Sequence, residues 1–339
     1  MKDPGLQVKL KFLVLAAVLA VLWLLAAPTL PSSGERALWE QLRAAQTYIA
    51  EWREQNGIAT PRELDPHACG LIGVEWSAIT TTLGDLEAKR TACDPAWAVQ
   101  FSRWYAELGL TPGDRVAIYS SASFPGFLLS ALAAAEARGL EPFLVVSLGA
   151  STWGANHPNA PWPVLATVLR RGGFLQTKAD FYTPGGGGES GGGMPPEGLE
   201  LLRRAARDAD VDWLQTTSLE ETIALKHRLL QRHGVRLLVS IGGPHANMGD
   251  DPGVLRLEPG LLLPGEAGPA GNGVIGRALD SGLPVIHMLN TRELSGRSGI
   301  PFDAAPGRKA PLRLNHWWSL AALALFFGVL LAHRRWRLV

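Results

Sequence analysis

The sequence predicts an α/β fold, in which a mainly parallel sheet with flanking helices lies between two transmembrane helices. The first observation is the segment 113–156, where the β-branched run Arg115 to Tyr119 and the apolar run Phe143 to Val146 enclose an Ala/Leu-rich helix. A helical crossover of this length makes the two strands parallel neighbours. The second observation is that a strand followed by a polar turn recurs at 236–241 and at 284–289. The third is an uncharged apolar run near each end of the chain. Together they predict a Rossmann-like domain with a membrane anchor at each end.

The two apolar runs, Phe12 to Ala27 and Trp317 to Ala332, contain no charged residue. With its flanks, each reaches about the lower end of the roughly 17–25 residues that span a bilayer. A buried core helix is the alternative for each, and a cleaved signal peptide is a further alternative for the first. The second run has two tryptophans at one edge and the basic cluster 333–337 at the other, which is typical of an interfacial belt and a cytoplasmic anchor.

The basic residues also predict the orientation. Lys2, Lys9 and Lys11 precede the first run, which favours a cytoplasmic N-terminus. A second span then returns the C-terminus to the cytoplasm and leaves the central domain outside, although three basic residues just before the second run weaken this signal. The predicted division is an N-terminal anchor at 1–31, an amphipathic juxtamembrane helix at 32–59, an extracytoplasmic α/β domain at 60–306, and a C-terminal span with a basic tail at 307–339.

Composition excludes some classes of function. The chain has 339 residues and a formal net charge of +1, which argues against nucleic-acid binding. Its two cysteines, Cys69 and Cys93, have no neighbouring Cys/His pair, so no zinc site is expected. In an oxidising compartment they could form a disulfide that stabilises the fold by about 3 kcal/mol, and two buried free thiols are the alternative.

The N-terminal half of the domain contains two predicted helices. A capping box at 32–35 begins a helix over 33–56, whose apolar residues recur at heptad-like spacing and predict a face packed on the domain or on a partner helix. Asp94-Pro95 begins a second helix, which ends at Gly109. Between them, Ile72 to Trp76 is a candidate strand, and the charged run 85–90 indicates a solvated face.

The second half continues the alternation, with helices predicted at 162–169, at 197–208 and from the capping box at 218–221 to Gly234. The segment 184–193 is the most glycine-rich part of the chain. Its composition favours a flexible linker, whereas its position before a helix favours a loop that cradles a ligand. It lacks the lysine and hydroxyl residue of a P-loop, so nucleotide hydrolysis is not expected.

The polar turns that follow the strands are the candidate binding site. Because parallel strands end at the same edge of a sheet, these turns should meet there, where ligands of open α/β sheets bind. Hydroxyls, amides and helix-start N–H groups favour an anion, although each such residue is by itself more often a turn or a cap. The candidate ligand-binding residues are Ser120, Ser121, Ser123, Ser147, Gly149, Ser151, Asn156, Gly242, Gly243 and Asn247, with His157, His245 and Asn290 at the same edge.

Catalytic candidates are fewer. Ser123 follows a strand and begins a helix, as a hydrolase nucleophile does, but its surroundings lack the G-x-S-x-G elbow. Thr81 is a second candidate hydroxyl, and His245 or His157 would have to lie within hydrogen-bond reach to act as the base. The histidines, including His287, lack the spacing of metal ligands, so no metal is expected, and no cofactor is indicated.

Several motifs resemble those of bacterial poly-γ-glutamate system proteins. These motifs are TTTLG at 80–84 with EAKRT at 87–91, SASFP at 121–125, SLGAS at 147–151 with WGAN at 153–156, and GG at 242–243 with Asn247 and Gly249. The resemblance covers roughly 73–301. It implies a role beside the proteins that make and export the poly-γ-glutamate capsule, and it assigns no catalytic residue. The chain departs from the family pattern at Ser121, Ala122 and Glu189, where glycine or an aspartate-containing loop is usual.

These observations predict an accessory component of poly-γ-glutamate synthesis or export in the bacterial cytoplasmic membrane. Its expected partners are the lipid bilayer, other synthase or export subunits, and an anionic polymer or small carboxylate bound in the strand-end crevice. The rim contains few Lys or Arg residues, which suits carboxylates better than phosphates. The alternatives are an extracytoplasmic amide hydrolase or transferase that acts on the polymer, through Ser123 or a hydroxyl of 80–82, and a membrane scaffold for the synthase subunits.

Overall fold

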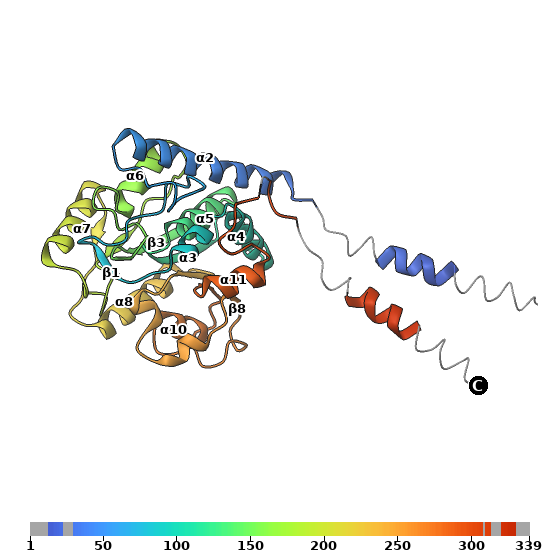
Figure 1. Cartoon of the computed structure of the whole chain (residues 1–339). Coiled ribbons are helices and arrows are strands. Elements are labelled where there is room, and N and C mark those ends of the chain that lie inside the picture. The colour runs from blue at the N-terminus through green and yellow to red at the C-terminus, as the bar shows by residue number, and fades with distance from the viewer. Residues whose placement is uncertain (1–12, 23–29, 308, 313–319, 330–339) are drawn as a thin grey trace, which may run out of the picture. The chain divides into compact units, whose positions relative to one another are not determined.

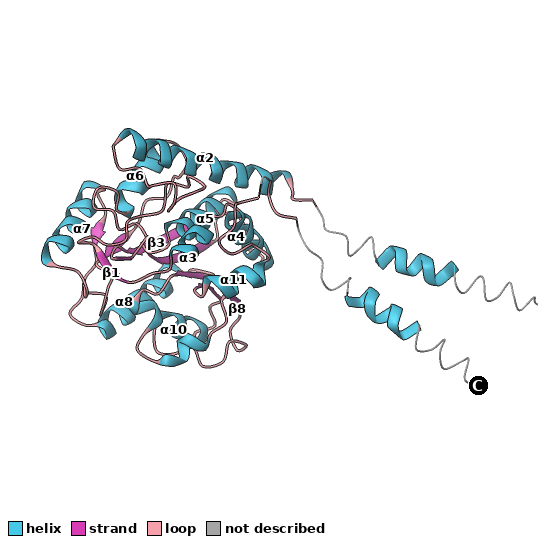
Figure 2. Ribbon diagram, viewed as in Figure 1, coloured by secondary structure: helices cyan, strands magenta, loops and turns pink. Residues whose placement is uncertain are grey.

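The computed structural model describes residues 13–22, 30–307, 309–312 and 320–329. A compact unit, Gly34–Ala310, contains the sheets (Figures 1 and 2). The segments 13–22 and 320–329 are helical and belong to a second unit. Across the described part of the chain, no helix combines the length and apolarity needed to cross a bilayer. The predicted spans Phe12 to Ala27 and Trp317 to Ala332 lie partly outside the described residues.

The central sheet has seven strands and is mainly parallel, as predicted. Its order is β6(Asp212–Trp213), β5(Phe181–Thr183), β3(Glu141–Ser147), β2(Arg115–Ser121), β7(Leu238–Ile241), β9(Val285–Met288) and β8(Gly260–Leu262). Each neighbouring pair is parallel except β8 and β9, which are antiparallel. The four predicted strands correspond to β2, β3, β7 and β9.

Helices cover both faces of this sheet. Alternate residues of each strand point to opposite faces, so Ile118 and Val146 belong to one buried cluster, whereas Tyr119 and Val145 belong to the other. The first cluster includes side chains of α2(Ser33–Gln55), α4(Ala96–Glu107), α5(Pro125–Ala137), α6(Trp162–Arg171) and α7(Pro196–Asp208). The second includes side chains of α8(Leu219–His233), α9(His245–Met248) and α10(Val274–Asp280). The unit therefore has three layers, with the sheet in the middle.

The helix α5 is buried along most of its length. Its sequence is apolar all round, which suits a helix covered by strands on one side and by another helix on the other. The ring of Phe127 packs edge-on against that of Trp97 in α4, with a centroid distance of 5.0 Å. Pro125 stands in its first turn, where no backbone donor is needed.

The helix α2 packs on this domain and is part of its core. Its stripe of Leu38, Leu42, Ala45 and Ile49 is buried in the first cluster. Near its end, the buried guanidinium of Arg53 donates hydrogen bonds to backbone oxygens of the following loop. The compact unit thus begins with α2 and extends beyond the segment 60–306.

Two local predictions in the segment 60–93 are wrong. Residues 72–76 form no strand, because the side chain of Asn156 hydrogen-bonds both backbone groups of Val74 in place of a ladder. The charged run 85–90 is not wholly solvated, because it enters α3(Leu86–Ala92) and buries Lys89 against the domain. A short second sheet, β1(Thr80–Thr82) paired in parallel with β4(Ala150–Ser151), lies beside this segment. The remaining described elements are a 3₁₀ turn, Pro252–Arg256, and α11(Thr291–Ser298).

The two cysteines are free and buried. Burial raises the pKa of the Cys69 thiol well above its usual value, and the neighbouring Cys93 thiol adds to this shift.

Candidate functional site

Three strands of the central sheet end at the same level. Ser121 of β2 is in register with Ser147 of β3, and Ser147 is in register with Thr183 of β5. The turns that follow them therefore share the carboxyl edge of the sheet. The sequence predicted this for the turns after β2 and β3, whereas it did not predict β5. The glycine-rich segment 184–193 continues directly from β5 at this edge.

The centre of the edge is a buried ion pair between Glu189 and Lys226. Their side chains are 0% and 1% exposed, and Lys226 Nζ lies 2.8 Å from Glu189 Oε1. The same carboxylate oxygen accepts hydrogen bonds from the hydroxyls of Ser147 and Thr183, and Oε2 accepts one from the backbone N–H of Ala246. A carboxylate thus occupies the anion position that the hydroxyl-rich turns predicted for a ligand.

The pKa of Glu189 favours its charged form. Burial by itself raises the pKa of Glu189, but the charge of Lys226 and the hydrogen bonds from Lys226, Ser147 and Thr183 outweigh burial and lower the pKa below its usual value. Asn247 supports Lys226 from the other side, with Oδ1 3.5 Å from Nζ. The amide nitrogen of Asn247 is fixed by Tyr119 O and Ser240 Oγ at 3.1 and 3.0 Å.

The glycine-rich segment is an ordered loop that inserts Glu189. Its backbone adopts positive φ at Gly185, Gly186, Gly188 and Glu189, with values of 70°, 67°, 66° and 58°. Such angles favour glycine, and a Cβ at Gly186 would collide with the carbonyl oxygen of Gly192. The composition that indicates a flexible linker therefore serves here to fold the chain tightly around one acidic side chain.

His245 is attached to this loop. Its Nδ1 accepts a hydrogen bond from the N–H of Gly188 at 2.9 Å, and its Nε2 lies 2.8 Å from Asp250 Oδ1. Because Nδ1 accepts, Nε2 carries the proton and donates to Asp250. His245 thus holds the loop, and its described hydrogen bonds do not include one to Ser123.

A second buried amine, Lys89, lies at the outer part of the edge. Its Nζ donates to Ser123 O at 2.6 Å and to Ser151 Oγ at 2.7 Å, and it lies 3.5 Å from the centroid of the Phe124 ring. Ser123 Oγ in turn accepts a hydrogen bond from the backbone N–H of Ser151 at 2.9 Å. These contacts join the turn after β2 and the strand β4 to α3.

The pKa of Lys89 is lowered from 10.5 to about 7, chiefly by burial, which the charges of Asp85 and Cys93 oppose in part. The side chain is 3% exposed, and the ion pairs among the described residues do not include it. Near neutral pH this amine therefore exists in both its neutral and its charged form, beside a serine hydroxyl. The sequence reasoning missed Lys89 because it lies in a run of charged residues.

The other candidates have mainly local partners. Ser120 Oγ donates to Ser121 O, and Thr81 Oγ1 donates to Ala150 O. Asn156 ties residue 74 to Thr80. Three more candidates have hydrogen-bond partners nearby in the sequence: Ser121 Oγ accepts from Ser123 N, His157 Nδ1 accepts from Asn159 N, and Asn290 donates to Glu293 at the start of α11. Of the glycines, Gly149 packs against the side chain of Thr81 and Gly242 against that of Ser121, whereas an added Cβ at Gly243 would meet open space.

His287 lies within β9, and burial lowers its pKa to about 4, so it is neutral at physiological pH. Among the described residues, no group of three or more His, Cys, Asp or Glu side chains is arranged to hold a metal ion.

The edge thus combines two chemical features. The inner one is the ion pair of Glu189 and Lys226, whose described partners come from the chain itself. The outer one is an amine of lowered pKa in contact with a serine hydroxyl, next to the exposed residues Thr82 and Leu83. Comparison of the chain with family models, with curated proteins and with solved structures gave no match.

Proposed function

We propose that this protein is a membrane-anchored accessory component of bacterial poly-γ-glutamate synthesis or export, and that its α/β domain binds the anionic glutamyl chain at the carboxyl edge of the sheet. The observation that carries the proposal is the convergence of the motifs that support the resemblance. Lys89, Ser123 and Ser151 come from three of these motifs and contact one another. Segments that are distant in sequence and share one contact cluster are what a binding site requires.

The neighbouring contacts extend this cluster to the other motifs. Asn156 donates to Thr80 Oγ1 at 2.9 Å, which joins the end of the motif WGAN at 153–156 to the motif TTTLG at 80–84. Gly242 lies so close to Ser121 that an added Cβ would be 2.5 Å from the serine oxygen. Residues of these motifs therefore hydrogen-bond or pack against residues of another motif.

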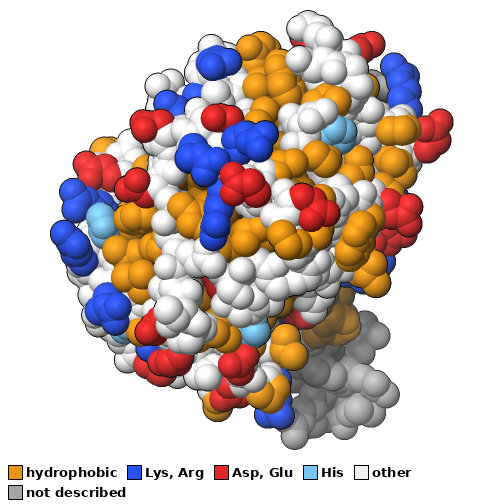
Figure 3. All heavy atoms as spheres, turned by 90° about the vertical axis from the view of Figure 1, so that its left-hand side faces the viewer, with side chains coloured by type: hydrophobic (Ala, Val, Ile, Leu, Met, Phe, Trp, Pro, Cys, Tyr) orange, Lys and Arg blue, Asp and Glu red, His pale blue; other side chains and the backbone are white. Residues whose placement is uncertain are grey.

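The glutamyl chain would bind the outer layer of this edge. Glu189 fills the inner layer, whereas Ser123 is half-buried and Thr82 is exposed. Lys89 is the one cation that contacts Ser123 and Ser151 among the described residues, so binding should depend only modestly on salt. Consistent with this, the face in Figure 3 shows acidic and basic side chains interspersed, without a broad field of one sign.

The binding test uses the purified full chain and γ-linked glutamate oligomers, measured by calorimetry. Changing both Ser123 and Ser151 to alanine should weaken binding by about 100-fold or more, because each lost hydrogen bond to a charged group is worth roughly 1.5–3 kcal/mol. Ser281→Ala, whose hydroxyl donates to Ala278 O in another part of the domain, is the matched control. Equal affinity of the double variant and the wild type would refute the site.

The topology in this proposal puts both termini in the cytoplasm and the domain outside the membrane, next to the synthase or export subunits. The basic residues that flank the two apolar runs support it. Protease added to spheroplasts should digest the domain, and protection of the domain would refute this orientation.

A second function, amide hydrolysis or transfer, is favoured by the contact between Lys89 Nζ and Ser151 Oγ at 2.7 Å. Neutral Lys89 would accept the proton of Ser151 as Oγ attacks the amide carbon, and would return it to the leaving amine as the C–N bond breaks. Water would then hydrolyse the acyl ester. Gly84 lies against Ser151 Oγ, so the segment 82–84 would have to move before substrate could reach the hydroxyl.

The two functions give different results with the same oligomers. Hydrolysis predicts steady shortening, loss of it in both Lys89→Met and Lys89→Arg, and covalent labelling of Ser151 by a fluorophosphonate. Binding without turnover predicts constant oligomer length and no labelled peptide.

A further inference from the structure

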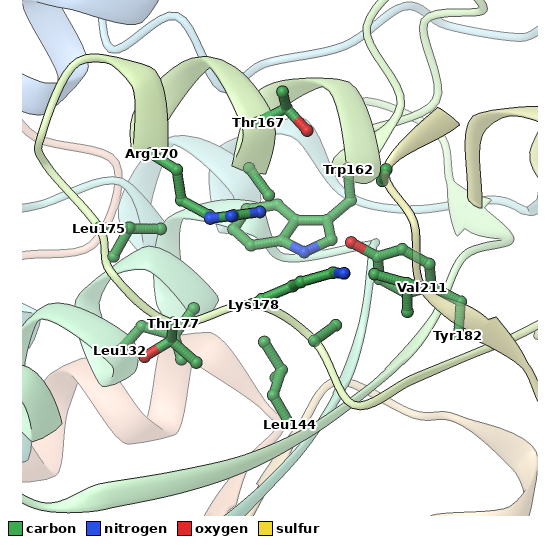
Figure 4. A pocket seen from close by; sticks show the side chains of 13 residues that line it. Leu132, Leu144, Trp162, Thr167, Arg170, Leu175, Thr177, Lys178, Tyr182 and Val211 are labelled. Carbon is green, nitrogen blue, oxygen red and sulfur yellow. The ribbon is translucent and has the colours of Figure 1, made fainter. Parts of the chain in front are cut away.

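A separate cavity lies between α6 and the strands β3 and β5, on the face of the sheet that α6 covers. Its lining includes Trp162 and Arg170 of α6, Leu144 of β3 and Tyr182 of β5. Lys178, in the loop before β5, reaches the same space (Figure 4). None of these residues belongs to the carboxyl-edge cluster, so the cavity is a second site.

One buried hydrogen-bond donor in this cavity, the indole N–H of Trp162, lacks an acceptor. Trp162 is 1% exposed, and its Nε1 has no hydrogen-bond partner although it is buried. An indole N–H can only donate, and the same holds for a guanidinium. Within the described part of the chain, the guanidinium of Arg170 has no carboxylate partner. Figure 4 shows both side chains, with the hydroxyl of Tyr182, around the same space.

The positive charge of Arg170 and the pairing of the nearby carboxylates favour a negatively charged ligand. Arg170 and Tyr182 line the same cavity (Figure 4). Burial raises the pKa of the Tyr182 hydroxyl, and the positive charge of Arg170 acts on the same group in the opposite direction. The nearby carboxylates already have partners. Glu136 accepts from Thr177, and Asp210, whose side chain is 97% exposed, pairs with Lys178.

The size of the cavity limits the ligand. Its volume of about 10 Å³ is room for one water molecule or one ligand oxygen. A carboxylate can place one oxygen inside and leave the other at the mouth, where Arg170 is exposed. A phosphate with one oxygen inside would leave three oxygens at the mouth, which is more than the two that the guanidinium fork of Arg170 matches.

We propose that the cavity binds a carboxylate, with one oxygen held by Trp162 Nε1 and the Tyr182 hydroxyl and the other by the Arg170 guanidinium. Arginine suits this role because its fork of donors matches a carboxylate. The carboxylate could belong to a free small acid or to a glutamyl chain. The inference does not depend on binding at the sheet edge, because the residues involved are different.

The test follows the indole N–H signal of Trp162 in the ¹⁵N-tryptophan-labelled full chain, assigned by its loss in Trp162→Phe. Acetate, L-glutamate, γ-linked glutamate oligomers, phosphate and chloride are added at equal ionic strength. We expect a saturable shift with carboxylates and none with phosphate or chloride. Tighter binding of the oligomer than of glutamate identifies a chain as the source, and equal binding identifies a free acid.

Variants distinguish binding in the cavity from non-specific electrostatic attraction of carboxylates to surface arginines. Arg170→Met should raise the dissociation constant at least tenfold, and Tyr182→Phe should also weaken binding. Arg171→Met removes the next arginine of α6, which is exposed and does not line the cavity, so it should leave affinity unchanged. The proposal is overturned if no carboxylate gives a saturable shift, in which case the cavity holds water only, or if the two arginine variants lose affinity equally.

Discussion

Replacing Lys89 by methionine should change how stability depends on pH. The pKa of Lys89 is about 7 in the folded chain, whereas an unfolded lysine keeps a value near 10.5. Between these two values the unfolded state binds more protons than the folded state, so the wild type should gain stability as pH rises above about 7. Methionine is of similar length and does not titrate, so the variant lacks this gain.

The expected size follows from the two pKa values. Between pH 7 and pH 9 the folded amine becomes almost wholly neutral while the unfolded amine stays charged, which adds about 2 kcal/mol to the free energy of unfolding of the wild type relative to the variant. Below about pH 7 the amine is charged in both states, so the difference between the two proteins should level off there. The buried charge is then a constant cost to the wild type.

Urea unfolding of both proteins at several pH values measures this difference. The difference in free energy of unfolding between the two proteins cancels the contribution of Cys69, whose raised pKa lowers the stability of both at alkaline pH. Lys178→Met, which removes an exposed lysine paired with Asp210, should show no such pH dependence relative to the wild type. A difference between the wild type and Lys89→Met that stays constant from pH 7 to 9 would refute the lowered pKa, and with it the role of Lys89 as a base.

Three further outcomes can be measured. Glu189→Gln and Lys226→Met should each lower the free energy of unfolding in urea by about 3–5 kcal/mol, because each leaves a buried charge unpaired. The double variant should lose clearly less than the sum of the two single losses, and additive losses would argue against the ion pair. Gly198→Ala should destabilise the fold strongly, since its Cβ would collide with the backbone oxygen of Ala78, whereas Gly243→Ala, which has open space, should be close to neutral in thermal unfolding. The two cysteines should react with a thiol reagent only after unfolding, since both are buried and the pKa of the Cys69 thiol is raised, and rapid labelling of the folded chain would contradict their placement.

The sequence predicted the middle of the sheet better than its edges. Strands β2 and β3 are seven residues each, and their β-branched and apolar runs give a clear pattern. Strands β5, β6 and β8 have only two or three residues, which is too short for a periodicity, and their positions depend on pairing with neighbours. The prediction that the polar turns share an edge rested on the parallel crossover alone, and the register of Ser121, Ser147 and Thr183 agrees with it.

The burial of Lys89 and of Glu189 at this edge could not be predicted from sequence. Lys89 lies among charged residues in a run that usually faces solvent, and its burial depends on a pocket that Phe124 and Ser151 provide from distant segments. Glu189 lies in a glycine-rich segment whose composition indicates disorder. The sequence does show that Glu189 is the single acidic residue of that segment. Its role becomes clear only from its partners in the fold, which are Lys226 and the hydroxyls at the strand ends.

The strand order has a consequence for how the chain folds. The central strand β2 obtains its first neighbour, β3, through the short α5 crossover, but Ile118 pairs on its other side with Val239, far along the chain. During synthesis, β2 therefore keeps one edge without a hydrogen-bonded neighbour until β7 has emerged. Non-local parallel pairing of this kind is slow, because the entropy of a long loop is lost before the contacts form. The newly made chain should consequently pass through a half-sheet with an exposed strand edge, and that species is the one most prone to aggregate or to require a chaperone.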